Sequence, residues 1–177
     1  MELFEKRIET KKIYEGRILD LDVDTVALPN GNEASREVVR HTGGVGVLAI
    51  DGEQNVWLVS QFRYPFEEVL LEIPAGKRDK RETPLECGKR ELKEETGLEA
   101  KQFVSLGKIY PTPAYTDEVI ELFLATGLKK GDQRLDPDEF LNLTVLPFKT
   151  AIEMAINGEI TDAKTVTALL KAAVTAF

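Results

Sequence analysis

The sequence predicts an α+β fold in which helices pack on a mixed sheet. Strand-like apolar runs come first, from the start of the chain to about Tyr64. The apolar positions then change to a helical spacing between Pro84 and Thr96. Strands resume after that helix, and two helices follow them. At 177 residues, the chain has the length of one compact unit.

A hairpin is expected in the first part of the chain. A β-rich run from Ile18 to Val26 ends at Pro29-Asn30-Gly31-Asn32, a sequence that favours a tight turn. The segment Glu33–His41 follows as the returning strand.

Further strands are expected on both sides of the first helix. Val45–Ile50 and Val56–Phe62 flank the turn sequence Asp51-Gly52-Glu53-Gln54-Asn55, and Val69–Ile73 precedes Pro74-Ala75-Gly76. Gly97 is placed to end the helix, because glycine readily adopts the left-handed conformation that closes helices. The strand-like segments after it are Phe103–Ile109, Val119–Ala125 and Phe140–Val145.

Two helices are predicted near the end of the chain. The first runs from about Phe148 to Asn157 and is closed by Gly158. The second begins near Thr161 or Asp162 and carries an apolar face formed by Val166, Leu169, Leu170, Ala173 and Val174. The polar segment Lys129–Asp138 contains a glycine and is expected to be a surface loop.

Charge and composition exclude several classes of partner. The formal charge is 23 − 31 = −8, which opposes binding to the phosphates of nucleic acids or of an anionic membrane surface. The longest apolar stretch, Val45–Ile50, is far too short to span a bilayer. The first residues contain no apolar signal region, and a single cysteine, Cys87, cannot form an intrachain disulfide. We therefore expect a cytoplasmic protein.

Acidic side chains are concentrated on the predicted helix. Glu91 and Glu95 are one turn apart, and Glu94 lies beside them, so three carboxylates share one face. They would repel one another unless a cation neutralised them, and a hard divalent ion with oxygen ligands does this well. The chain has no set of cysteines and histidines for zinc, so Mg²⁺ is favoured and Mn²⁺ is possible. The alternative is a solvated acidic helix face.

The spacing of these residues favours the metal site. Five residues separate Gly76 from Glu82, seven more lead to Arg90, and Arg90-Glu91-Leu92-Lys93-Glu94-Glu95-Thr96-Gly97-Leu98 follows. This pattern resembles the Nudix box, GX5EX7REUXEEXGU with U aliphatic, at all nine defined positions. The resemblance implies an α/β/α sandwich around a mixed sheet. It also implies a hydrolase that acts on a nucleoside diphosphate linked to another moiety.

The resemblance also implies roles for individual residues. Glu91, Glu94 and Glu95 would hold the metal, together with the backbone carbonyl of Ala75. Arg90 would orient these glutamates by charge-assisted hydrogen bonds. Glu94 and Arg90 are accordingly counted among the catalytic residues.

The sequences that flank the box resemble the ADP-ribose pyrophosphatase branch of this family. They are Gln61-Phe62-Arg63-Tyr64-Pro65, Leu71-Glu72-Ile73-Pro74-Ala75-Gly76-Lys77 and the proline-bearing segment Tyr110–Glu118. Pro113, fifteen residues beyond Leu98, is the branch marker and a candidate substrate-binding residue. The usual glycine after that proline is Ala114 here, which departs from the pattern. Asp162-Ala163-Lys164-Thr165 resembles the start of the C-terminal helix of this branch.

A second acidic segment provides the candidate base. Asp138-Glu139-Phe140 resembles the mobile acidic loop that supplies a catalytic glutamate in this branch. Glu139 is the first candidate for the base or for a late metal ligand, with Asp138 and Asp136 behind it. The alternative is a polar loop without a catalytic role.

Two arginines are candidates for binding the substrate phosphates. The planar guanidinium groups of Arg63 and Arg36 match phosphate oxygens well. For Arg36, a plain surface charge that pairs across strands is an equally good interpretation.

The resemblance divides the chain and predicts its activity. Residues 1–41 would form an N-terminal antiparallel β extension that builds a homodimer, and residues 42–177 would form the Nudix domain. The predicted activity is Mg²⁺-dependent cleavage of ADP-ribose into AMP and ribose 5-phosphate. The alternatives are a pyrophosphatase for another nucleotide sugar, such as GDP-mannose or other ADP-sugars, and a non-catalytic ADP-ribose sensor.

Overall fold

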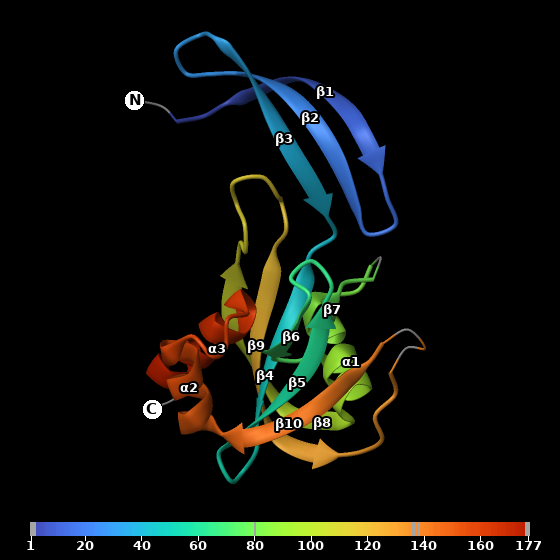
Figure 1. Cartoon of the computed structure of the whole chain (residues 1–177), viewed down its shortest axis with the longest axis vertical. Helices are drawn as coiled ribbons and strands as arrows, with labels where there is room; N and C mark the ends of the chain where they lie inside the picture. Colours follow the sequence, from blue (N-terminus) through green and yellow to red (C-terminus); the bar gives the residue numbers. More distant parts are fainter. Residues whose placement is uncertain (1–2, 80, 136, 138, 176–177) are drawn as a thin grey trace. The chain divides into compact units, whose positions relative to one another are not determined.

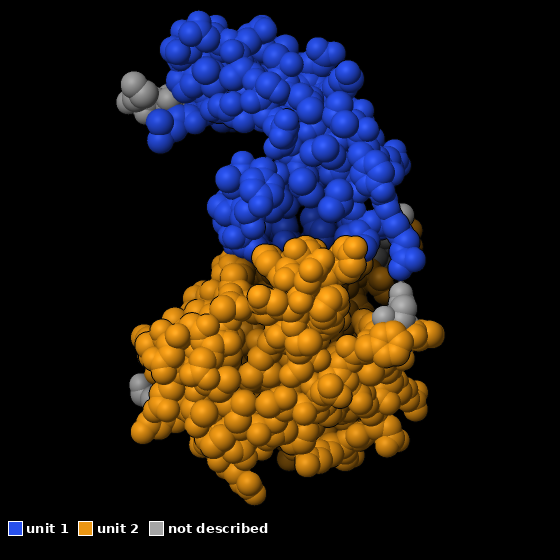
Figure 2. All heavy atoms as spheres, in the orientation of Figure 1, with its two compact units in different colours: residues 1–43, 110–119 blue, residues 44–109, 120–177 orange. Residues whose placement is uncertain are grey.

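The computed structural model describes residues 3–79, 81–135, 137 and 139–175. The chain divides into two compact units, which Figure 2 shows in different colours. The first contains residues 1–43 and 110–119, and the second contains residues 44–109 and 120–177.

The first unit contains a three-stranded antiparallel sheet in the order β1-β2-β3 (Figure 1). Its strands are β1 (Lys6–Glu15), β2 (Leu19–Ala27) and β3 (Glu33–His41). The predicted turn joins β2 to β3, and Gly31 adopts φ +87° there, a conformation that glycine adopts without steric cost. The antiparallel hairpin expected in this region is confirmed.

An ionic network lies inside this first unit. Asp22 and Asp24 occupy alternate positions of β2 and are buried on the same side. Arg40 on β3 binds both, with Nε 3.0 Å from one carboxylate and Nη2 2.9 Å from the other. The segment 110–119 adds Asp117, which accepts a hydrogen bond of 2.8 Å from the backbone of His41.

The second unit contains a larger mixed sheet in the order β10-β5-β4-β9-β8. Two shorter strands extend it, β6 beside β5 and β7 beside β4. Strands β4 and β9 run parallel, whereas the other paired strands run antiparallel. The bounds are β4 (Gly44–Ile50), β5 (Asn55–Arg63), β6 (Glu68–Glu72), β7 (Ala75–Lys77), β8 (Leu98–Ile109), β9 (Ile120–Lys130) and β10 (Leu141–Pro147).

Helices cover both faces of this sheet. Figure 1 shows α1 (Pro84–Thr96) on one face and α2 (Phe148–Asn157) and α3 (Ala163–Thr175) on the other. Every residue of β4 is buried, because alternate side chains enter two separate hydrophobic clusters. Val45 and Val47 pack with Leu92 of α1, and Leu48 packs with Leu169 of α3. The predicted α+β fold, a sandwich around a mixed sheet with an N-terminal β extension, is confirmed.

The ends of α1 are fixed by local chemistry. Thr83 and Glu86 form a reciprocal capping box at its start, and Pro84 occupies the first turn. Gly97 closes the helix at φ 71°, and its N–H donates to the carbonyl of Lys93 at 2.8 Å. The helix therefore begins and ends where the sequence predicted.

Several boundaries differ from the sequence-based expectations. Strand β8 begins at Leu98 rather than at Phe103, and β9 continues to Lys130. The predicted surface loop from Lys129 therefore starts two residues too early. In the described part of the chain, no helix has the length and apolar character needed to cross a membrane.

The close approach of α1 to the sheet depends on Gly88. A Cβ atom at this position would lie 3.1 Å from methyl groups of both Val45 and Val47. We expect Gly88→Val to destabilise the protein by about 2 kcal/mol, because it overpacks the core. Chemical denaturation measures this loss. Lys89→Val, exposed on the same helix, should cost less than about 1 kcal/mol; equal losses would contradict the packing argument.

Candidate active site

Helix α1 brings the predicted carboxylates to one side of the second unit. Glu91 and Glu95 are one turn apart and are 7% and 3% exposed, although both carry ionisable groups. Glu94 lies nearer to solvent, with 39% of its side chain exposed. Buried carboxylates need hydrogen bonds or cations around them, so their partners determine what this site can do.

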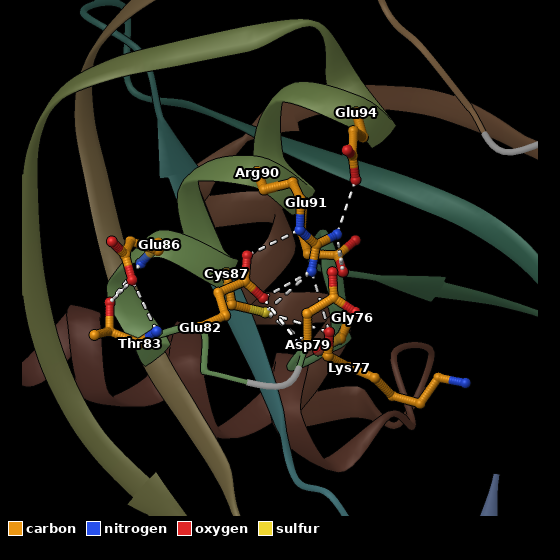
Figure 3. A network of polar contacts seen from close by, with 10 residues as sticks. All are labelled: Gly76, Lys77, Asp79, Glu82, Thr83, Glu86, Cys87, Arg90, Glu91 and Glu94. Carbon is orange, nitrogen blue, oxygen red and sulfur yellow. Dashed lines mark hydrogen bonds and ion pairs between the residues drawn. The ribbon is translucent and has the colours of Figure 1, made fainter.

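Arg90 is the centre of the hydrogen-bond network in Figure 3. Its Nε and Nη2 donate to Glu82 at 2.9 and 3.0 Å. Its Nη1 donates to Glu91 at 2.8 Å and to Glu94 at 2.9 Å, and Nη2 also donates to the carbonyl of Lys77. The hydrogen bonds from Arg90 lower the pKa of Glu82 to about 2. One guanidinium therefore orients three carboxylates.

The short strand β7 lies directly against the buried carboxylates. The N–H of Ala75 donates to Glu95 at 3.0 Å. A Cβ atom at Gly76 would lie only 1.9 Å from Oε1 of Glu91. Any side chain larger than that of glycine would therefore displace this carboxylate.

Burial makes this site unfavourable for negative charge. Burial raises the pKa of Glu91 to about 7, although Arg90 opposes the shift. Burial raises the pKa of Glu95 to about 8, against the hydrogen bond from Ala75, and the nearby charges of Glu91 and Glu139 act in the same direction as burial. An additional cation would therefore favour the ionised form of both groups at neutral pH.

The donor set fits a divalent metal ion. Among the described residues, no three side chains of His, Cys, Asp or Glu form a ready-made cage. Arg90 binds Glu91 and Glu94 instead, and Glu95 turns toward the backbone of Ala75. All the available donors are oxygens, and the raised pKa values mean that a cation could replace protons on two of them. A hard ion such as Mg²⁺ or Mn²⁺ suits these ligands.

Glu139 lies in the loop that precedes β10, and its side chain is partly buried. Its charge contributes to the raised pKa of both Glu91 and Glu95, which places it near them. Asp136 and Asp138, the other two acids considered for this loop, lie outside the described residues.

The start of this loop is attached to the end of α1. Three hydrogen bonds connect them: Gly131 N to Gly97 O at 2.7 Å, Arg134 N to Glu94 O at 2.9 Å, and Gln133 Nε2 to Glu95 O at 2.5 Å. The helix that carries the acidic residues therefore also anchors the segment that leads to Glu139.

Arg63 ends β5 on the same unit. Its Nε and Nη2 donate to Glu72 at 2.7 and 2.6 Å, while 39% of its side chain stays exposed. The charge of Glu95 contributes to the raised pKa of Arg63, so the two groups are near each other. Glu72 and its second partner, Lys164, were not predicted as site residues. The sequence signal that could have identified Glu72 is its position as the one acidic residue within the otherwise apolar run Val69–Ile73.

The other two candidate substrate residues belong to the first unit. Arg36 forms a two-pronged ion pair with Glu5, with distances of 2.9 and 2.7 Å. Pro113 lies exposed in a turn of the segment 110–119. The carboxylate cluster around Glu91 and Glu95 belongs to the second unit.

The fold and the acidic box define the class of protein. The NUDIX domain model matches residues 40–169, and the model for a nucleoside diphosphate sugar hydrolase N-terminal domain matches residues 5–39. The chain belongs to the Nudix hydrolase family, whose members generally use divalent metal ions.

Named relatives extend over nearly the whole chain. It is 44% identical to the methanol dehydrogenase activator of Bacillus methanolicus, with 93% of this chain and 90% of the relative covered. It is 40% identical to the ADP-ribose pyrophosphatase of Bacillus subtilis, with 94% and 91% covered. A solved structure of an ADP compounds hydrolase superposes with a TM-score of 0.85 at 21% identity, covering 98% of this chain and 95% of that one. The last match supports the fold.

The raised pKa values predict how stability depends on pH and metal. The folded-state pKa values of Glu91 and Glu95 exceed the ordinary value of 4.5, so the folded state holds protons that the unfolded state releases. With EDTA present, the loss of these protons should therefore lower the free energy of unfolding as the pH rises from about 5 to about 8. Added Mg²⁺ should raise Tm more at the higher pH.

Thermal denaturation with and without Mg²⁺ measures this effect. The double variant Glu91→Gln, Glu95→Gln is the control, because neither amide titrates. Its Tm should respond little to Mg²⁺ at either pH. A Mg²⁺ response that is independent of pH in the unmodified protein would contradict the assignment.

Proposed function

We propose that this chain is a Mg²⁺-dependent ADP-ribose pyrophosphatase that hydrolyses its substrate to AMP and ribose 5-phosphate. The observation that carries the proposal is the 40% identity to an ADP-ribose pyrophosphatase over 94% of the chain. The buried carboxyl groups of Glu91 and Glu95 supply oxygen ligands that suit the divalent ion of a diphosphate substrate.

The metal ligands in this proposal come from α1 and β7. Glu91, Glu94, Glu95 and the carbonyl of Ala75 would hold Mg²⁺, with Mn²⁺ as a possible substitute. A bound divalent ion supplies charge neutralisation for the diphosphate and lowers the pKa of a water. Arg90 keeps Glu91 and Glu94 in position through its hydrogen bonds of 2.8 and 2.9 Å.

The candidate substrate contacts in this proposal are Arg63, Arg36 and Pro113. Arg63 presents a partly exposed guanidinium to the diphosphate while Glu72 fixes its orientation. Pro113 and Arg36 belong to the first unit, and Arg36 would have to exchange Glu5 for substrate. Arg63 is therefore the stronger of the two arginine candidates.

Glu139 is the proposed base. It would accept a proton from the attacking water, and it could also become a late metal ligand. The electrostatic contributions of Glu139 to Glu91 and Glu95 support this role, because they indicate that its carboxylate lies near these two glutamates.

The proposed protein is a homodimer built by the N-terminal extension, residues 1–41. All the residues of β1 are exposed in the single chain, and they include apolar ones. Ile8, Ile13 and Tyr14 are 53%, 49% and 58% exposed. A second copy of the chain would remove this apolar surface from water. Residues 42–177 would then form the Nudix domain of each subunit.

A cytoplasmic location is also proposed. Cys87 is the only cysteine of the chain, and it is buried as a free thiol. Burial raises its pKa to about 12, which keeps it protonated and unreactive. The structure therefore does not depend on an oxidising compartment.

A comparison of substrates tests the proposed activity. The protein with Mg²⁺ should turn over ADP-ribose faster than GDP-mannose or other ADP-sugars. Glu95→Gln should reduce turnover at least about 100-fold, because loss of one charged metal ligand removes several kcal/mol of stabilisation. Near-normal rates in this variant, at unchanged Tm, would contradict the metal assignment. Faster turnover of GDP-mannose would contradict the substrate assignment.

The assignment of the base gives a separate prediction. Glu139→Gln should lower kcat about 100-fold or more, with a much smaller change in KM, because the amide cannot accept the proton. Glu153→Gln is a matched control on α2, where the side chain forms only a long ion pair of 3.9 Å with Lys149. Unchanged kinetics in Glu139→Gln would assign the base to another residue.

The most similar relative named above favours a second candidate function. Because that protein is a methanol dehydrogenase activator, this chain could stimulate an alcohol dehydrogenase. A methanol dehydrogenase assay with and without the chain tests this function. Stimulation that disappears in Glu95→Gln indicates an effect of hydrolysis. Stimulation that persists indicates an effect that does not need hydrolysis.

A further inference from the structure

The first turn of α3 is attached to the segment that leads into the candidate metal site. The backbone N–H of Ile73 donates to the hydroxyl of Thr165 at 2.8 Å. That hydroxyl and the N–H of Thr165 both donate to Asp162, which precedes the helix. Lys164 binds the carboxylate of Glu72 in the same turn. Two neighbouring residues of the segment Glu72–Ala75 are therefore attached to α3.

Lys164 is unusual because its charge is buried. The residue is 8% exposed and Glu72 is 1% exposed. A cation near a helix N-terminus is also disfavoured by the helix dipole. Glu72 already receives two hydrogen bonds from Arg63, so neutralising Glu72 does not require Lys164. The position of this buried ammonium needs a further explanation.

Charge counting supplies that explanation. Arg63 and Lys164 contribute two positive charges, and Glu72 and Asp162 contribute two negative charges. Oε2 of Glu72 accepts from both cations, and Asp162 accepts from Lys164 at 2.9 Å. Without Lys164 the group would carry a net charge of −1 beside Glu95, another carboxylate. Such a surface would repel a diphosphate.

We propose that Lys164 is a positioning residue for substrate binding. It shares Glu72 with Arg63, so the exposed part of the Arg63 guanidinium keeps a fixed orientation and a positive field toward the diphosphate. Lys164 itself does not touch the substrate. The inference rests on the proposed function, because it assumes that Arg63 faces a diphosphate.

The test measures substrate affinity separately from turnover. Lys164→Met removes the charge and keeps an unbranched side chain. The KM for ADP-ribose should rise about tenfold, which corresponds to the weakening of one charge-assisted hydrogen bond between Arg63 and the substrate. The value of kcat should change less than about threefold. Calorimetry with a methylene-bridged ADP-ribose analogue and Mg²⁺ should give the same rise in Kd. The matched control is Lys171→Met on the same helix, where Lys171 binds the carbonyl of Leu106; it should leave both constants near those of the unmodified protein.

Two more variants separate the positioning role from a structural one. In an Arg63→Ala background, Lys164→Met should raise Kd by a smaller factor than it does in the unmodified protein, since the orientation of Arg63 no longer contributes and only the charge of Lys164 is lost. Lys164→Gln is also neutral but keeps a hydrogen-bond donor for Glu72, so it gives a second test if Lys164→Met does not fold. It should raise Kd by a similar factor.

The outcomes distinguish the inference from the function on which it rests. Wild-type affinity in Lys164→Met or Lys164→Gln, or an undiminished effect in the Arg63→Ala background, would overturn the role of Lys164. Analogue binding by the unmodified protein without turnover of ADP-ribose would overturn the proposed function and leave the role of Lys164 in place.

Discussion

The candidate active site depends on two carboxyl groups that the fold keeps away from water. Glu91 and Glu95 are almost fully buried beside β7, and Gly76 leaves the room that Glu91 needs. Arg90 donates to Glu91, whereas the backbone N–H of Ala75 donates to Glu95. The positive charge beside Glu91 and Glu95 is therefore too small to balance the negative charge that both would carry when ionised. A divalent cation is the simplest partner that would remove this deficit, because its ligands are already oxygens held in position.

Such a site requires a rigid support, because flexible glutamates would turn toward water. Helix α1 is fixed at both ends by its capping box and by Gly97, and Gly88 lets it pack closely on β4. The end of the same helix anchors the loop that leads to Glu139. Packing of the hydrophobic core therefore determines where the acidic groups lie, and the unfavourable electrostatics of the site are offset by interactions elsewhere in the fold.

The sequence predicted those features that have a local signal. The helix Pro84–Thr96, its ends and the acidic face follow from residue spacing within one turn or two. Strand β1 was not identified individually, because all its residues are exposed and no burial alternation marks its sequence. The contact between Glu72 and Lys164 joins residues 92 positions apart, and it gives no periodic signal at either one. Sequence reasoning therefore located the acidic face of α1 but not the ionic group beside it.

Two ionic groups, one centred on Arg90 and one on Lys164, contact the two ends of the segment from Glu72 to Lys77. Their different residues suggest that they have different roles. Arg90 binds the carbonyl of Lys77 at one end and gathers carboxylates that belong to the box. Lys164 binds Glu72 at the other end, outside the box, and shares it with Arg63. On our proposal, the first group sets the geometry of the metal ligands and the second sets the field that meets the substrate. Because the second group lies outside the box, its residues could change with the substrate while the metal site stays the same.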